Sequence, residues 1–201
     1  MSEALPVILA SASKARHQIL VNAGITHARE SADVDEKAIR DELQKSGTDA
    51  AAAATALARA KATAVAKRHA SVLVIGADQL LVSDGRWFEK PKDRADALAT
   101  LQALRGRTHQ LVTAIAVSRD GRHAWDNVTT ARLTMRKFSD DFAARYLDTA
   151  GPDTLTSVGA YRLEAEGAQL FTVIEGDYFA ILGLPLLPLL GYLREARVLE
   201  R

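Results

Sequence analysis

Apolar and polar positions change their spacing several times along the chain, and each change predicts an element. Residues 7–10 form an unbroken apolar run, which is typical of a strand buried on both faces. Small and hydroxyl residues follow, and Ser13 has the residue type of an N-cap for a helix that runs to Ala23 and ends at Gly24. The pattern therefore predicts a strand that turns directly into a helix.

Two more helices are predicted after this pair of elements. The first is short and charged and covers residues 35–44, and the second is rich in alanine and covers residues 49–67. Leu57, Lys61 and Val65 recur every four residues along the second helix, so they share one face. Lys61 is therefore expected on the apolar side of its helix, away from the solvent-facing charges.

A second buried strand is predicted over residues 71–75, where β-branched apolar side chains dominate. This run ends in Gly76, Ala77 and Asp78, so the pattern predicts a carboxylate at the C-terminal end of the strand. Ligands of open α/β sheets gather at that end of the strands. Asp78 is therefore a candidate site residue.

The rest of the chain alternates between strands and helices, without an internal repeat. The predicted elements are a hairpin at Asp84-Gly85, a helix over residues 93–104, strands over 110–117 and 124–135, a helix from Ser139 to Gly151, and a strand over 171–174. Residues 178–193 are apolar but short for a membrane span, and Pro185 and Pro188 interrupt them. We expect a buried strand, a turn and a core-facing final helix there.

Composition limits the class of protein. With 201 residues, 48% of them hydrophobic, the chain can form one large domain or two small ones that share a sheet. It has no cysteine, which excludes disulfides, thiolate nucleophiles and zinc ribbons. The 26 basic and 25 acidic residues nearly balance, without a run of five like charges, which disfavours nucleic acid as a partner. The start of the chain lacks a secretory signal pattern, so we expect a cytoplasmic protein with no membrane segment.

The sequence motifs of P-loop, dinucleotide-binding, zincin and α/β-hydrolase proteins are absent. Cations at the ends of elements remain as candidate chemistry. Arg16 at a helix start, Lys61 on an apolar face and Lys90 before a proline are three cations that suit a triphosphate, provided that the fold gathers them. The turn at residues 11–13 adds hydroxyls and unpaired amides that suit an anion, although an ordinary capped helix explains the same pattern.

Acidic side chains are candidate metal ligands. Asp33, Asp35 and Glu36 cluster before a predicted helix, and Asp78 follows a predicted strand. Hard oxygen ligands of this kind suit Mg²⁺, which also takes phosphate oxygens. Acids before helices are often caps and an aspartate after a strand is often a turn former, so the residues by themselves leave both interpretations open.

One stretch carries a family resemblance that extends over nearly the whole chain. LASASKARHQIL, at residues 9–20, resembles the opening LASxSPRRxxLL of the Maf family of nucleoside triphosphate pyrophosphatases. A single such motif is weak evidence for a family, whereas several motifs in the same order are specific evidence. The further motifs, in the family's order, are DVDE at residues 33–36, LARAKA at 57–62, VIGAD at 74–78, EKPKD at 89–93, LRGRTH at 104–109, SVGAYRLE at 157–164 and GDYFAILGLPL at 176–186.

This resemblance implies an α/β fold with an elongated central mixed β-sheet flanked by helices, as in inosine triphosphate pyrophosphatases. It implies a single domain over residues 1–201, in which two lobes share the sheet around a cleft. It also implies a house-cleaning activity that hydrolyses a nucleoside triphosphate to the monophosphate and pyrophosphate with a divalent cation, Mg²⁺ or Mn²⁺. Members of the family are frequently homodimers, so a homodimer is a further expectation.

The resemblance also implies roles for single residues. Asp78 matches the proposed general base and would also hold the metal, and the sequence does not choose between these two roles. The residues matched in this way are Ser11, Ser13 and Arg16 for the phosphates, the two cleft lysines Lys61 and Lys90, and Glu36 and Asp78 for the metal.

Three departures from the family pattern concern the substrate. Ala15 stands where the family usually has the first of two arginines. Gln79 replaces the usual threonine after Asp78, and Glu164 stands where pyrimidine-handling members have glutamine. Together these residues resemble the branch that includes 7-methyl-GTP pyrophosphatases. A carboxylate facing a base suits N–H donors or a cationic methylated guanine, so Gln79 and Glu164 are expected to contact the substrate.

A second class of function stays open at this point. Members of the family are associated with inhibition of septum formation, so the chain could be a nucleotide-binding regulator of cell division without significant turnover. Binding alone would need the three cations but not Asp78. A DNA-binding module is a third class, and the near-neutral net charge of +1 disfavours it.

Overall fold

The computed structural model describes residues 5–200, and its strands form a seven-stranded sheet within that range. The strand order is β2-β1-β3-β5-β6-β7, with β4 paired to β3. Because β1 is parallel to β2 and β3 whereas β4 and β7 are antiparallel to their partners, the sheet is mixed. The strands are β1 (Val7–Leu9), β2 (Ala28–Arg29), β3 (Leu73–Ser83), β4 (Arg86–Phe88), β5 (Thr108–Arg119), β6 (Arg122–Met135) and β7 (Phe171–Glu175).

The described chain divides into two compact units, and it passes from one to the other within β3, β5 and β6 and again between residues 182 and 183. The first unit holds residues 5–78, 113–129 and 183–200, and the second holds residues 79–112 and 130–182. The predicted α/β fold, a central mixed sheet flanked by helices, is confirmed.

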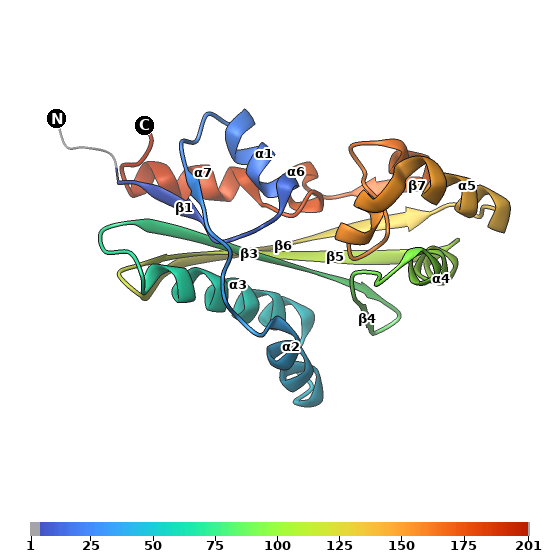
Figure 1. Cartoon of the computed structure of the whole chain (residues 1–201), viewed down its shortest axis with the longest axis horizontal. Helices are drawn as coiled ribbons and strands as arrows, with labels where there is room; N and C mark the ends of the chain where they lie inside the picture. Colours follow the sequence, from blue (N-terminus) through green and yellow to red (C-terminus); the bar gives the residue numbers. More distant parts are fainter. Residues whose placement is uncertain (1–4, 201) are drawn as a thin grey trace. The chain divides into compact units, whose positions relative to one another are not determined.

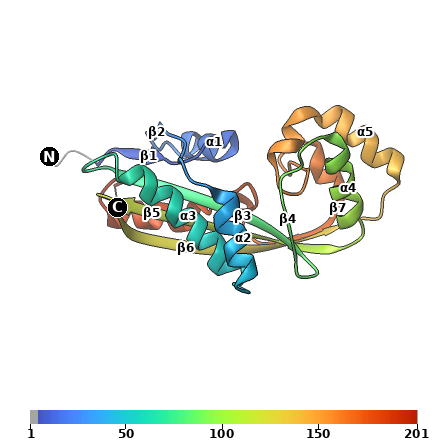
Figure 2. The same cartoon turned by 60° about the horizontal axis from the view of Figure 1, so that its bottom comes forward.

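In the first unit, helices cover both faces of the strands. Figures 1 and 2 show α3 along one face, and Figure 1 shows α1 and α7 on the other. Apolar side chains of β1, β3 and α3 fill the space beneath α3, and Val65 and Val74 in this core are fully buried. The helices of this unit are α1 (Lys14–Asn22), α2 (Glu36–Lys45), α3 (Ala50–Ala66) and α7 (Leu186–Glu195).

The second unit has its own apolar core. Leu101, Leu133 and Leu170 are fully buried in it, and α4 packs against α5. Buried apolar area of this kind drives the packing of the helices on the strands. Its helical elements are α4 (Arg94–Leu104), α5 (Asp140–Ala150), η1 (Gly151–Thr156), η2 (Glu166–Leu170) and α6 (Tyr178–Ile181). No helix within residues 5–200 combines the length and apolar character that crossing a bilayer requires.

The predicted helix starts are confirmed, because each depends on a local capping bond. Ser13 Oγ accepts from the amide of Arg16, and Asp49 Oδ1 accepts from the amide of Ala52. Asp35 caps α2 in the same way, and Ser139 caps α5. A side chain three residues before the amide decides these boundaries, so they can be predicted without knowledge of the tertiary structure.

The predicted end of β3 is wrong. The strand does not stop at residue 75 but continues through Asp78 to Ser83, so Asp78 lies in mid-strand rather than at a strand end. Gly76 suggested a break, but it is needed within the strand because α3 crosses it closely. A Cβ at Gly76 would lie 2.3 Å from the carbonyl oxygen of Ala58 and 2.7 Å from the amide nitrogen of Ala62.

Two further elements differ from the sequence prediction. Residues 178–181 form the short helix α6 instead of a buried strand, because Asp177 Oδ1 accepts from the amide of Ala180 at 2.7 Å and starts a helical turn. The strand β2 was not predicted, because it has only two residues and both are exposed, so no apolar run marks it.

Candidate active site

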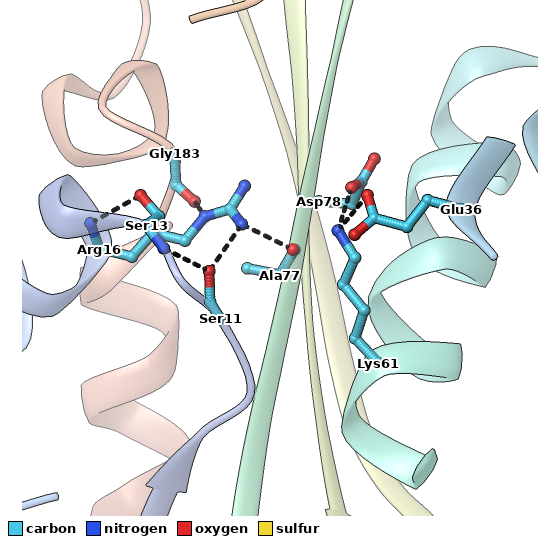
Figure 3. Close-up of polar contacts among 8 residues, drawn as sticks. All are labelled: Ser11, Ser13, Arg16, Glu36, Lys61, Ala77, Asp78 and Gly183. Carbon is cyan, nitrogen blue, oxygen red and sulfur yellow. Dashed lines mark hydrogen bonds and ion pairs between the residues drawn. The ribbon is translucent and has the colours of Figure 1, made fainter. Parts of the chain in front are cut away.

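The turn between β1 and α1 places Arg16 against the backbone of β3. The amide of Ala10 donates to the carbonyl oxygen of Ile75 at 2.7 Å, which is where the pairing of β1 with β3 ends. The next carbonyl on the same edge of β3 belongs to Ala77, since carbonyl direction alternates along a strand. Arg16 Nη1 donates to it at 2.9 Å, as Figure 3 shows. The guanidinium therefore takes the place in which β1 would have continued.

Two other acceptors fix the same side chain. Arg16 Nε donates to the carbonyl oxygen of Gly183 at 2.7 Å, and Nη1 also donates to Ser11 Oγ at 3.3 Å. Gly183 has φ +101°, a conformation that favours glycine, and a Cβ there would lie 3.3 Å from Arg16 Nε. Arg16 Nη2 has no hydrogen-bond partner among residues 5–200, so this nitrogen is available for an anion.

The two serines of the predicted phosphate-binding turn bond to their own turn. Ser11 Oγ accepts from the amide of Ser13 at 3.2 Å, and Ser13 Oγ accepts from the amide of Arg16 at 3.3 Å. The amides of Lys14 and Ala15 come next, in the first turn of α1, where amides have no partner inside the helix. The structure thus gathers Ser11, Ser13 and Arg16 in one turn at the start of α1.

Lys61 of α3 lies on the other side of β3 and joins two carboxylates. Its Nζ is 2.7 Å from Asp78 Oδ1 and 2.8 Å from Glu36 Oε2, and Figure 3 shows all three side chains pointing toward one another. The side chains of Lys61 and Asp78 are only 8% and 6% exposed, whereas that of Glu36 is 43% exposed. The prediction that Lys61 lies on the apolar side of its helix is confirmed.

Arg16 and the two carboxylates share one electrostatic environment. Burial lowers the pKa of the Arg16 guanidinium, while the nearby charges of Asp78 and Glu36 raise it. Arg16 and Lys61 carry two positive charges and the carboxylates carry two negative ones, so the formal charge of the cluster is zero. We use the name charge cluster for these four side chains, Arg16, Glu36, Lys61 and Asp78.

The charge cluster has one unpartnered oxygen. Asp78 Oδ2 is buried and has no hydrogen-bond partner among the described residues. A buried carboxylate oxygen without a donor is costly unless a ligand or cation meets it. Within residues 5–200, no group of three or more histidine or acidic side chains gathers to hold a metal ion. Glu36 and Asp78 therefore fit a divalent cation only as a pair of hard oxygen ligands to which a substrate adds its own oxygens.

The other predicted site residues belong to the second unit. Gln79 Nε2 donates to the carbonyl oxygens of Ala180 and Ile181 at 3.0 and 3.1 Å, so its amide is held by α6. Glu164 Oε1 accepts from Arg162 Nε at 3.0 Å, and Lys90 is exposed after β4. The substrate contacts expected of Gln79, Lys90 and Glu164 stay predictions.

Two residues that position these groups, Gly183 and Arg162, were not predicted to have a role. The carbonyl oxygen of Gly183 accepts from Arg16. The only feature of the sequence that indicates this role is a glycine within the otherwise apolar residues 180–186. Arg162 bonds to Glu164 and also to Asp153 Oδ2 at 2.8 Å. Its signal is only a charge two residues before Glu164, which many surface segments share.

Residues 6–196, almost the whole chain, match the Maf-like protein family. The chain belongs to the Maf family. The sequence-based assignment is thereby confirmed, and in this Maf protein the charge cluster joins a buried lysine to a buried aspartate.

Named relatives of this Maf protein match nearly its full length. A nucleoside triphosphate pyrophosphatase of Granulibacter bethesdensis is 49% identical over 97% of this chain and 99% of its own length. Another protein of that name, from Nitrobacter winogradskyi, is 51% identical over 97% of this chain and 96% of its own. A 7-methyl-GTP pyrophosphatase of Rhizobium etli is 50% identical over 96% of this chain and 98% of its own.

Proposed function

We propose that this Maf-family protein is a nucleoside triphosphate pyrophosphatase with a house-cleaning role. The observation that carries this proposal is the charge cluster, in which Lys61 joins the buried Asp78 to Glu36 while Arg16 is fixed across β3. Two cations suit the phosphates, and two carboxylates suit a metal ion and a proton. The names of the relatives, at about half identity over nearly the full chain, support the same reaction.

Glu36 and Asp78 are the residues that would hold Mg²⁺ or Mn²⁺. The buried unpartnered Oδ2 of Asp78 supports this assignment, because it offers a hard oxygen ligand with no protein donor. Such an ion, when bound, would neutralise charge on the phosphate oxygens and polarise the phosphorus under attack.

The residues of the site would then have separate roles in the reaction. Arg16 Nη2 and Lys61 Nζ bind phosphate oxygens, and Lys90 is the further cation that we propose for the same task. Asp78 accepts a proton from the attacking water, whose oxygen bonds to the α-phosphorus. The bond from that phosphorus to the bridging oxygen breaks, and pyrophosphate leaves with the electron pair, so the products are nucleoside monophosphate and pyrophosphate.

We propose a modified purine, such as 7-methyl-GTP, as the substrate class. The support is Glu164, an acidic group two residues from Arg162, whose Nε bond at 3.0 Å fixes the carboxylate. A fixed carboxylate favours base N–H donors and a positively charged ring over the carbonyl edge of uracil or thymine. Gln79 is the second proposed base contact.

The experiment is a nucleotide panel. The purified protein is incubated with 7-methyl-GTP, GTP, dTTP, UTP or CTP, with Mg²⁺, Mn²⁺ or EDTA, and both products are quantified. We expect equal amounts of monophosphate and pyrophosphate, highest for 7-methyl-GTP and lost in EDTA. Saturable nucleotide binding without product would instead favour the nucleotide-binding regulator of cell division. Light scattering on the same preparation tests the proposed homodimer.

A further inference from the structure

The position of Lys61 between two carboxylates gives this side chain a second role. We propose that the Lys61 ammonium is a built-in counterion that keeps divalent cations out of the Glu36–Asp78 pair until a triphosphate draws it away. The inference rests on the proposed function, because it concerns the same two carboxylates. It adds an order to the reaction: the nucleotide and its cation enter together, and the protein without nucleotide holds a divalent cation poorly.

The geometry supports the counterion role directly. Lys61 Nζ is in contact with Asp78 Oδ1 at 2.7 Å and with Glu36 Oε2 at 2.8 Å, so it occupies one oxygen of each carboxylate that would hold a metal ion. An ammonium is a compact charge with three donors, so it can balance the charge of two carboxylates in the absence of a metal ion. Figure 3 shows the Lys61 amine at the meeting point of the two acids.

The balance of charge supports coupled entry. The charge cluster is formally neutral, and the side chains of Lys61 and Asp78 are almost completely buried. A divalent cation by itself would add two positive charges beside Lys61, in a place where water screens them poorly. A triphosphate brings several negative charges and offers Lys61 new acceptors, so the ammonium can leave the carboxylates as the cation arrives.

Lys61 as a purely structural residue is the competing explanation, and the two make opposite predictions. A structural ion pair stabilises the fold, and a divalent cation would not compensate for its loss. A counterion, once removed, leaves two carboxylates that attract a cation, so the cation should restore the stability that the variant has lost. The second outcome requires the cation to bind where the ammonium was.

The test measures Mn²⁺ binding in the absence of any nucleotide, by calorimetry and by the loss of the free-ion electron paramagnetic resonance signal. The proteins are the wild type, Lys61→Met and Lys61→Gln, and the melting temperature of each is followed with and without Mn²⁺. The matched control is Arg59→Met, which removes a cation two residues earlier on α3. Arg59 Nε donates to Asp126 at 2.6 Å, outside the charge cluster.

We expect both Lys61 variants to bind Mn²⁺ at least about tenfold more tightly than the wild type, and to gain more in melting temperature. Arg59→Met should match the wild type in Mn²⁺ affinity. Equal affinity of wild type and Lys61 variants would overturn the proposal. Wild-type affinity for Mn²⁺ tighter than about 1 mM would overturn it too, even if both variants failed to fold.

Failure of the proposed function is seen separately. The Mn²⁺ titration contains no nucleotide and does not depend on turnover. In one outcome, the wild type releases no pyrophosphate in the nucleotide panel but the Lys61 variants gain Mn²⁺ affinity. This would contradict the pyrophosphatase proposal and support the counterion role of Lys61. In the other, the wild type turns over nucleotide but the Lys61 variants gain no Mn²⁺ affinity. This would contradict only the counterion role of Lys61.

Discussion

The Arg16 guanidinium donates a 2.7 Å hydrogen bond to the carbonyl oxygen of Gly183, a residue 167 positions later in the chain. A second nitrogen of the same group donates to the carbonyl of Ala77 at 2.9 Å. Two backbone acceptors from distant segments therefore hold the planar group, and they leave Nη2 directed away from both. Preorganisation of this kind lowers the cost of ordering a phosphate-binding side chain in the reaction.

Arg16→Lys should lower kcat/KM for pyrophosphate release by about two orders of magnitude. Lysine keeps the charge, but one ammonium cannot reach Gly183, Ala77 and a phosphate oxygen at the same time. Steady-state kinetics on the best nucleotide of the panel measure the loss. Arg59→Lys is the control, since this exposed arginine pairs with Asp126, and it should keep wild-type kinetics. Unchanged kcat/KM in Arg16→Lys would remove Arg16 from the proposed site.

Asp78→Asn should reduce turnover by about 10²- to 10⁴-fold, because the amide neither accepts the proton nor balances a metal ion. The cations remain, so equilibrium binding of the nucleotide should persist. Single-turnover assays and calorimetry measure the two effects. Asp126→Asn, which alters an acid of the first unit outside the charge cluster, should retain activity. Near-normal turnover in Asp78→Asn would refute both proposed roles of this carboxylate.

Gly76→Ala should destabilise the fold by about 3 kcal/mol, because the new methyl group meets backbone atoms that cannot move aside. It would lie 2.3 Å from the carbonyl oxygen of Ala58 and force α3 away from β3. Gly191→Ala is the matched change, since a Cβ there has no atom within 4 Å and the residue lies inside α7. That variant should gain about 0.5–1 kcal/mol. Urea denaturation of both variants gives the comparison, and equal stabilities would contradict the close contact.

His109 should make stability depend on pH. Burial lowers its pKa to about 4 from the usual 6.5, and Nε2 lies 2.7 Å from the Tyr161 hydroxyl oxygen in the core of the second unit. The unfolded chain therefore takes up the proton first as the pH falls. The contribution of neutral His109 to the free energy of unfolding is complete above pH 6.5. It is lost progressively as the pH falls to about 4. The loss amounts to about 3 kcal/mol.

The comparison for His109 is His109→Phe, which has no proton to gain. Urea denaturation at a series of pH values between 4 and 6.5 should give a smaller slope for the variant than for the wild type. The variant also loses its contact with Tyr161, which lowers stability at every pH and leaves the slope unaffected. Equal slopes would mean that His109 titrates normally in the folded protein.

Helix starts and the buried side of α3 followed from the sequence because their causes are local. Ser13, Asp35 and Asp49 each cap an amide three residues later, and no distant contact is needed for that bond. The four-residue spacing that placed Lys61 among apolar residues is likewise a property of one helix. By contrast, the length of β3 was mistaken, because the glycine that looks like a strand break is a response to α3 packing on it.

By itself, the sequence determined the family, the alternation of strands and helices, and which residues are able to carry chemistry. Only the tertiary structure decided that Lys61 joins Asp78 to Glu36 and that Gly183 holds Arg16. These contacts connect residues of separate elements. The distances between those residues depend on how α3, β3, the start of α1 and the segment around Gly183 pack together. No spacing rule within a segment contains that information, since it depends on the sum of many apolar contacts made elsewhere in the fold.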